Sequence, residues 1–159
     1  MKNLKRVVLF MSLSIALACS DANDDDLGTT GEGTLTANVD GSAFSSLNIT
    51  AGAVVTNGVA AIQGSTSDGT YIRINIANYN GKGTYAIGSS LTDMTSLSYG
   101  TIKPAIAAWL ASSLIPNSSG TIEITDDTDS SISGTFSFTG YNDTDKKVIT
   151  DGKFNVPKN

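Results

Sequence analysis

The sequence predicts an all-β fold, an antiparallel meander of about nine to ten strands that forms a sandwich or a barrel-like domain. Three observations lead to this prediction. Ser, Thr, Gly and Asn make up about 42% of the 159 residues, which suits strands joined by many turns. Short blocks of β-branched and aromatic residues alternate with polar residues. Asp-Gly and Asn-Gly pairs separate these blocks, and such pairs favour the tight turns of β-hairpins.

Residues 1–18 are predicted to be a signal peptide that is separate from the fold. Lys2, Lys5 and Arg6 give a positive start, and an apolar run covers residues 7–18. A transmembrane helix needs about 20 apolar residues. The run is therefore too short to span a membrane, and it suits the hydrophobic part of a signal sequence.

The apolar run ends at the only Cys of the chain, in the order Ala16-Leu17-Ala18-Cys19. Small residues directly before a Cys resemble the lipobox of bacterial lipoproteins. The resemblance implies that Cys19 becomes the mature N-terminus and carries acyl chains, which anchor a protein to a membrane without spanning it. Lipidation would leave no thiol for a disulfide or a nucleophile. An ordinary cleaved signal peptide with a chance Cys is the alternative.

Residues 19–32 are predicted to be the lipidated Cys and an acidic, flexible tether. The Asp residues that follow the Cys repel one another and cannot pack a core. Ser-Asp and further acids after a lipidated Cys resemble the export signal of surface lipoproteins in Bacteroidota-type bacteria. The residues of this signal are Ser20, Asp21, Asp24, Asp25 and Asp26. The resemblance implies the outer membrane, with the cell surface as the predicted side and the periplasmic face as the alternative.

The charge and the residue types exclude several classes of function. Three of the ten Lys and Arg residues lie in residues 1–18, so the mature net charge is about −8. Such a surface repels phosphate backbones, and we predict no nucleic-acid partner. The chain has no His, and Glu32 and Glu123 are its only glutamates. No nucleophile is paired with a base. We therefore predict no enzyme, no catalytic residues and no cofactor.

The predicted domain spans residues 33–159, and its first strands alternate between apolar and polar residues. The strands expected before residue 90 are residues 34–39, 59–62, 71–76 and 84–87, with extended apolar pieces within residues 44–55. The hairpin pairs begin at Asp40, Asn57, Asp68, Asn80 and Asp151. The clearest strand is 71–76, in which the three isoleucines share one face. Tyr71, Arg73 and Asn75 share the other face.

The second half of the domain is less regular. Within residues 97–114, Ile106, Trp109 and Leu110 have helical spacing, but the segment also suits a strand. We favour a strand because the segments around it are β, and the helix stays open. The last third predicts three strands, within residues 121–125, 131–140 and 147–156. Acidic turns at residues 126–129 and 142–145 join them.

One family resemblance covers residues 34–156 in order. Residues 36–44 (TANVDGSAF) resemble the opening of an uncharacterised Bacteroidota surface-lipoprotein family, whose domain begins with a strand, Asp-Gly and an aromatic residue. Its members continue with a run like residues 120–125, an acidic turn and a run like residues 132–138. They close like residues 149–156. The resemblance implies an uncharacterised domain, and because the family has no assigned activity or functional residues, none are carried over to this chain.

The candidate ligand-binding residues are aromatic and polar side chains that suit a sugar ring. They are Trp109, Tyr71, Arg73, Asn75, Tyr85 and Tyr99. Aromatic residues are usually buried or paired across strands, so a sugar platform needs several of them exposed on one face. The acidic turns offer oxygen ligands to Ca²⁺, but no complete loop with a distal Glu follows. We therefore predict no metal site.

The predicted function is a lipid-anchored lipoprotein of the outer membrane and cell surface that carries a non-catalytic binding module. The membrane is contacted through the N-terminal lipid, and a glycan is the first ligand considered. Two alternatives stay open. One is a structural or protein-interaction component of the envelope, marked by an uncovered apolar patch or an unpaired edge strand. The other is a barrel that binds a small apolar ligand, which needs a closed sheet with an unfilled interior.

Overall fold

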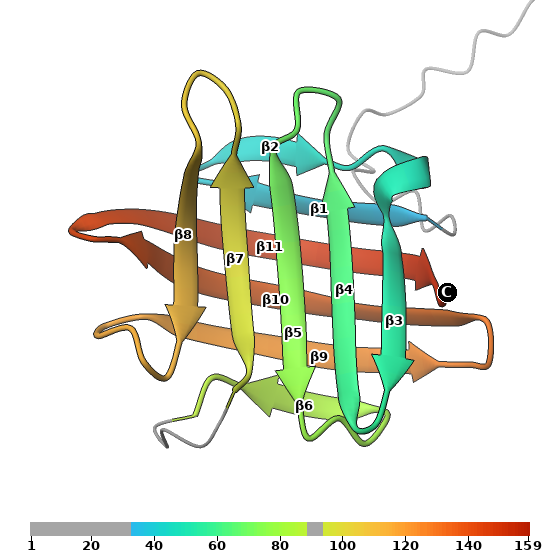
Figure 1. The fold of residues 1–159 in the computed structure, drawn as a ribbon. Coiled ribbons are helices and arrows are strands. Elements are labelled where there is room, and N and C mark those ends of the chain that lie inside the picture. The colour runs from blue at the N-terminus through green and yellow to red at the C-terminus, as the bar shows by residue number, and fades with distance from the viewer. Residues whose placement is uncertain (1–32, 89–93) are drawn as a thin grey trace, which may run out of the picture.

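The computed structural model describes residues 33–88 and 94–159 of the chain. These residues form an all-β structure of eleven strands in an antiparallel sheet that curls into a half-barrel (Figure 1). The all-β prediction is confirmed, and the strands number one more than the upper expectation. Cys19 and the export residues 20–26 lie outside the described residues. Within the described part, no helix has the length and apolar character needed to cross a membrane.

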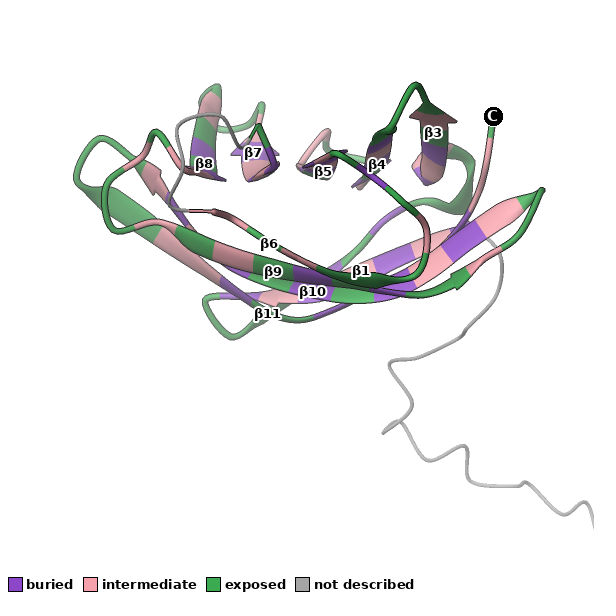
Figure 2. Cartoon of the chain, turned by 90° about the horizontal axis from the view of Figure 1, so that it is seen from below, coloured by how far each residue is buried: buried purple, intermediate pink, exposed green. Residues whose placement is uncertain are grey.

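The strands form two layers that face each other. One layer, here called the five-stranded layer, consists of β3 (Gly52–Thr56), β4 (Val59–Ser65), β5 (Tyr71–Ala77), β7 (Ser96–Thr101) and β8 (Ala107–Ser112). The second layer consists of β1 (Thr34–Val39), β2 (Ser42–Ser45), β6 (Gly83–Ala86), β9 (Ser119–Asp127), β10 (Ser131–Asn142) and β11 (Asp145–Pro157). Strands of one layer cross those of the other (Figure 1), and Figure 2 shows the layers edge-on.

Strand pairing joins the layers at opposite sides. On one side, Tyr141 near the end of β10 pairs with Leu110 of β8. On the other side, Ala53 of β3 forms an isolated parallel bridge with Lys158. The backbone N–H of Asn159 donates to the Ala53 carbonyl at 2.9 Å. β3 is the last strand in the order β2-β1-β11-β10-β8-β7-β5-β4-β3, so this bridge covers part of its edge.

The core lies between the layers and follows the period-two pattern of the strands. Ile72, Ile74 and Ile76 are all fully buried, whereas Arg73 between them is exposed. The predicted faces of this strand are therefore confirmed. The fully buried large side chains of the two layers are Leu35, Ile62, Ile72, Ile74, Ile76, Leu97, Ile122, Ile132, Ile149 and Val156. Phe136, Phe138 and Phe154 complete this core from the second layer.

The predicted turn pairs take three different conformations. Asp40-Gly41 and Asn57-Gly58 have positive φ at both residues, as a type I′ hairpin requires. In Asp68-Gly69 and Asn80-Gly81, only the glycine has positive φ. The hairpin expected at Asp151-Gly152 is wrong, because this pair lies inside β11. The register against both β1 and β10 shifts there, so the pair accommodates an extra residue as a β-bulge.

The ambiguous segment contains a strand, β8, as favoured from the sequence. Its three residues with helical spacing do not share a face. Trp109 is buried on the inner side, Leu110 is exposed on the outer side, and Ile106 lies in the β7–β8 loop with 88% of its surface exposed. The helical spacing of these residues therefore does not indicate a helix, because two of them lie in a strand and the third lies in the loop before it.

An ion pair fastens the β1–β2 turn to β11. The Nζ of Lys147 lies 2.8 Å from Oδ2 of Asp40, and the N–H of Val148 donates to Oδ1 at 2.9 Å. Lys147 also lies over the Trp109 ring, 5.4 Å from its centroid. The bond from Lys147, followed by that from Val148, holds the pKa of Asp40 below its ordinary value of 3.8. In turn, the hydrogen bond to Asp40 raises the pKa of Lys147.

This ion pair predicts a specific dependence of stability on pH. Because the pKa of Asp40 is lowered by folding, its contribution is present above about pH 4 and disappears as the pH falls through the folded value. We expect Asp40→Asn to lower the melting temperature at pH 7, and the difference from wild type to shrink as the pH falls below about 4. Asn keeps the positive-φ turn, so the backbone is matched. Thermal melts from pH 2 to pH 8 test this, and a constant difference over the whole range would contradict it.

Candidate ligand-binding groove

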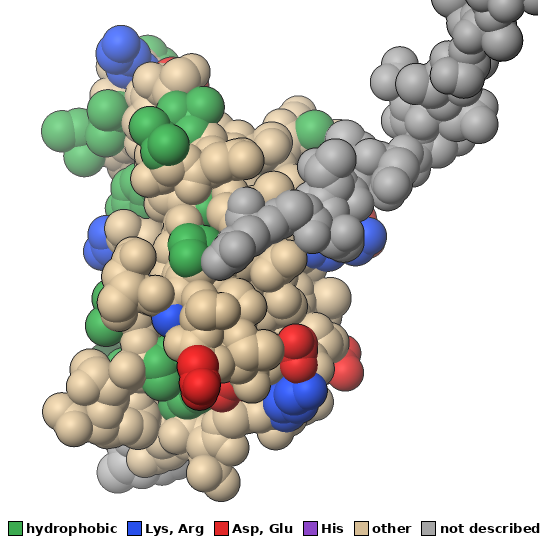
Figure 3. Space-filling view, turned by 90° about the vertical axis from the view of Figure 1, so that its right-hand side faces the viewer, with side chains coloured by type: hydrophobic (Ala, Val, Ile, Leu, Met, Phe, Trp, Pro, Cys, Tyr) green, Lys and Arg blue, Asp and Glu red, His purple; other side chains and the backbone are tan. Residues whose placement is uncertain are grey.

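The outer face of the five-stranded layer differs in charge from the rest of the domain. Its five strands contain one charged residue, Arg73, and no Asp or Glu. In the second layer, β9 contains carboxylates, and β11 contains both carboxylates and lysines. Figure 3 looks onto the side of β3, with the outer face of this layer at the left rim. Hydrophobic groups recur along that rim, and acidic groups gather lower and toward the right.

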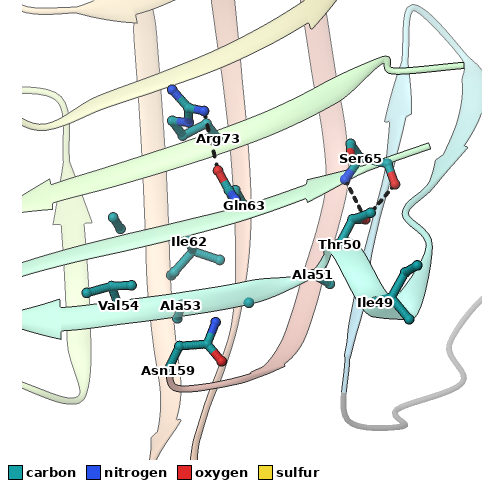
Figure 4. A pocket seen from close by; sticks show the side chains of 12 residues that line it. Ile49, Thr50, Ala51, Ala53, Val54, Ile62, Gln63, Ser65, Arg73 and Asn159 are labelled. Carbon is teal, nitrogen blue, oxygen red and sulfur yellow. Dashed lines mark hydrogen bonds between the residues drawn. The ribbon is translucent and has the colours of Figure 1, made fainter. Parts of the chain in front are cut away.

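A groove crosses this outer face over β3, β4 and β5. One hollow has a volume of about 460 Å³ (Figure 4) and is lined by small residues such as Gly52 and Ala61. A second hollow of about 260 Å³ shares Gln63 and Arg73 with the first and adds Tyr71. We call the two hollows together the outer groove. Other lining side chains are those of Ile49, Thr50, Val54, Ser65 and Asn159.

The polar centre of the groove is set by strand register. Gln63 of β4 pairs directly with Arg73 of β5, and Nη2 of Arg73 donates to Oε1 of Gln63 at 3.3 Å. In Figure 4 the two side chains meet above the strands. The guanidinium Cζ also lies 5.7 Å from the centroid of the Tyr71 ring. Gln63 and Tyr71 therefore orient the one charged side chain found in the five described strands of this layer.

The Tyr71 ring lies across the sheet because its cross-strand partner has no side chain. Tyr71 pairs with Gly100 of β7. A Cβ at Gly100 would lie 2.3 Å from Cζ of Tyr71, so the ring occupies the space that a side chain would need. Tyr71 is half-buried in this position. The ring is thus held along the surface beside Arg73, with its outward side toward solvent.

The opposite end of the groove is shaped by the segment before β3. The 3-10 turn η1 (Asn48–Thr50) is fastened to β4, since Oγ1 of Thr50 accepts from the N–H of Ser65 at 3.0 Å. This turn leaves Ile49 with 93% of its surface exposed at the rim. The amide Nδ2 of Asn159 lies 3.0 Å from the position of a Cβ on Gly52, so the amide covers that glycine. An amide and an apolar rim therefore face the Arg73–Gln63 pair.

The six candidate residues from the sequence lie in three places. Tyr71, Arg73 and Asn75 share the outer face, and the first two line the groove. The amide of Asn75 is 3.4 Å from Oγ of Ser96.

Tyr99 and Trp109 instead form a cross-strand pair on the inner face, with ring centroids 5.6 Å apart. Nε1 of Trp109 donates to Oδ2 of Asp145 at 2.9 Å. Tyr85 lies on β6 in the second layer and stacks on Tyr79 at 5.6 Å. The structure therefore does not unite the six residues in one platform.

Sequence reasoning missed the residues that complete the groove. Gln63 carries only a partial signal, because a two-residue turn at Asp68-Gly69 would place Gly64 opposite Arg73, whereas the observed loop pairs Gln63 with Arg73. Gly100 and Asn159 carry no comparable signal, since their roles depend on pairing between β5 and β7 and on the bridge to β3.

The first acidic turn expected, at residues 126–129, begins inside β9, and its two strand residues form ion pairs. Asp126 pairs with Lys82 at 2.6 Å. Asp127 pairs with Lys158 and accepts from the hydroxyl of Tyr79 at 2.9 Å. The bond from Lys158 lowers the pKa of Asp127, and burial raises the pKa of Tyr79. Over residues 33–88 and 94–159, no three His, Cys, Asp or Glu side chains are grouped so that they could hold a metal ion.

Comparison with known proteins gives one match. A family model described as a domain of unknown function, DUF6252, matches residues 31–157. No curated protein and no solved structure matches the chain. The description of the family names no activity, so the groove itself is the basis for assigning a function.

Proposed function

The chain belongs to DUF6252, and from this premise we propose that its domain is a non-catalytic module that binds a glycan in the outer groove. The observation that carries the proposal is the Tyr71 ring held beside the Arg73–Gln63 pair in a surface hollow. Aromatic rings pack against the C–H faces of sugars. Planar amide and guanidinium groups donate to and accept from ring hydroxyls. A hollow with few converging polar groups is typical of a ligand site.

The proposal includes a place for the module. We propose that Cys19 is lipidated and that the acidic residues after it direct the lipoprotein to the outer surface of the outer membrane. The lipobox-like residues 16–19 and the acids of residues 20–26 support this. Protease added to intact cells should then remove the domain. Survival of the domain until the cells are lysed would exclude the surface location.

A protein-interaction component of the envelope is the second candidate. Val54, Val59 and Leu110 lie on the same outer face with 47%, 43% and 37% of their surfaces exposed. They are spread over β3, β4 and β8, and of the three only Val54 lines the groove, so the observation favours a protein contact only weakly. The barrel hypothesis has no comparable support, because isoleucine, leucine and phenylalanine side chains fill the space between the layers.

Removal of the Tyr71 ring tests the glycan module. We expect Tyr71→Ala to weaken binding of a responsive glycan by about 10-fold, the size of one lost aromatic contact. Tyr71→Phe keeps the ring and should bind within about twofold of wild type. A glycan array would find the ligand, and calorimetry would give the Kd values. The proposal fails if no glycan binds, or if Tyr71→Ala binds as well as wild type.

A second variant tests whether the position of the Tyr71 ring matters, separately from its presence. Gly100→Ala places a Cβ where the end of the Tyr71 ring lies. Because the ring can swing outward, the domain should stay folded. Its glycan binding should fall toward that of Tyr71→Ala, and unchanged binding would show that the ring position is unimportant.

A further inference from the structure

We propose that the outer groove selects glycans that carry an anionic group, a carboxylate or a sulfate, and that Arg73 binds this group. The inference rests on the proposed glycan module and names its ligand class. It is argued from the distribution of charge, the geometry around Arg73 and the net charge of the chain.

In the described part of the domain, Arg73 differs from three of the six lysines in forming no ion pair, and the other three, Lys103, Lys146 and Lys153, lie outside the five strands of this face. Lys82, Lys147 and Lys158 each form an ion pair with an Asp. Among the described residues, no ion pair is formed by Arg73, which pairs instead with the neutral Gln63. Its own strand and the four other strands of the layer supply no carboxylate. The guanidinium is therefore the cation of this face that an anionic ligand can engage.

The geometry leaves the guanidinium able to bind a planar anion. A guanidinium has five N–H donors, and Gln63 occupies one through Nη2. Contact with the Tyr71 ring orients the group without using a donor. The remaining fork matches the paired oxygens of a carboxylate or a sulfate. A sugar that lies over Gly52 and Ala61 would place its acid group at Arg73 and its hydroxyls toward Asn159.

The net charge limits how acidic the ligand can be. The chain without residues 1–18 has a net charge of about −8, which repels a densely charged polyanion at long range. Screening confines this repulsion to about 10 Å at moderate salt. The groove therefore suits a glycan with separated acid groups, one of which reaches Arg73. An exposed ion pair contributes little alone, so Gln63, Tyr71 and the sugar contacts are needed with it.

Matched ligand pairs test the inference on the purified full chain. The carboxylate pair is tetragalacturonate with one free carboxylate and three methyl esters, compared with the fully esterified tetramer, and the sulfate pair is a carrageenan tetrasaccharide and its desulfated form. We expect the acidic member of one pair to bind about 10-fold more tightly than its neutral member, with the responding pair identifying the anion. Raising NaCl from 50 to 300 mM should weaken only the acidic member.

Substitutions at Arg73 assign the preference to this residue. Arg73→Gln should remove the difference between acidic and neutral members, and Arg73→Lys should keep only part of it, because the fork is lost. Lys146→Gln is the matched control, since it removes one exposed cation from the start of β11, in the other layer. Circular dichroism would check that each variant is folded.

The outcomes separate the two proposals. If neutral glycans bind as tightly as acidic ones, or if Arg73→Gln keeps the preference, the acidic-ligand inference is overturned while the glycan module stands. If neither these pairs nor a wide glycan array gives binding, the glycan module fails and the inference fails with it.

Discussion

Replacing Gly134 by alanine is expected to destabilise the domain by about 3 kcal/mol or more. Gly134 is buried in β10, between β9 and β11. An added Cβ would lie 2.1 Å from the carbonyl oxygen of Glu123 and 2.7 Å from Cζ of Phe154. The carbonyl belongs to the β9 backbone, so relief of the clash requires the sheet to separate. Urea unfolding followed by circular dichroism would measure the loss.

Gly52→Ala is the control for this clash. A Cβ at Gly52 would meet only the side-chain amide of Asn159 at 3.0 Å and no backbone atom closer than 3.8 Å. The flexible amide can move, and alanine reduces the entropy of the unfolded chain. We therefore expect a change within about 1 kcal/mol. Equal losses for Gly52→Ala and Gly134→Ala would contradict the steric explanation.

The sequence was sufficient to predict strands and neighbouring hairpins. Alternation along 71–76 fixed both faces of β5, and the pairs at Asp40 and Asn57 formed the expected turns. These are local features, set by side-chain period and backbone preference. The pairing of β1 with β11 joins Thr34 to Asn155, and that of β6 with β9 joins Gly83 to Ile124. Local patterns do not specify such distant partners.

The Asp151-Gly152 bulge shows the same limit within one strand. Its two residues are typical of a turn, and only the ladders on both sides of β11 keep the strand continuous. The bulge also serves the core, since the Phe136 ring lies 2.7 Å from where a Cβ of Gly152 would be. The glycine is therefore required by packing as well as by conformation.

The candidate site was predictable in part. Period two placed Tyr71, Arg73 and Asn75 on one face, which the structure shows to be the outer face. In a strand, Tyr99 shares a face with Leu97, which is two residues away and buried. Because the sequence left residues 97–114 open between helix and strand, the inward position of Tyr99 was not predicted. The groove itself needed the register of three strands. A single sequence does not place Gln63, Gly100 and Asn159 around the same side chains.

Removal of the Phe136 ring should cause the second large loss of stability, about 3–5 kcal/mol for Phe136→Ala. The ring is buried and lies 6.5 Å from the ring of Phe138 and 6.3 Å from that of Phe154, centroid to centroid. Because Gly152, which lies next to the Phe136 ring, has no side chain, it cannot fill the cavity that Phe136→Ala leaves. Phe136→Leu should lose less, about 1–2 kcal/mol, since it keeps most of the buried apolar volume.

Thr135→Ala is the control for Phe136→Ala, because Thr135 is exposed on the same strand and should change stability by no more than about 0.5 kcal/mol. Denaturant midpoints of the three variants would give these losses. A loss below about 1 kcal/mol for Phe136→Ala would mean that the phenylalanines do not form part of the continuous core. Below its lowered melting temperature, Phe136→Ala should still bind ligand, because the outer groove lies on the opposite layer. A Phe136→Ala protein that is folded but unable to bind would instead show that packing in the second layer controls the shape of the groove.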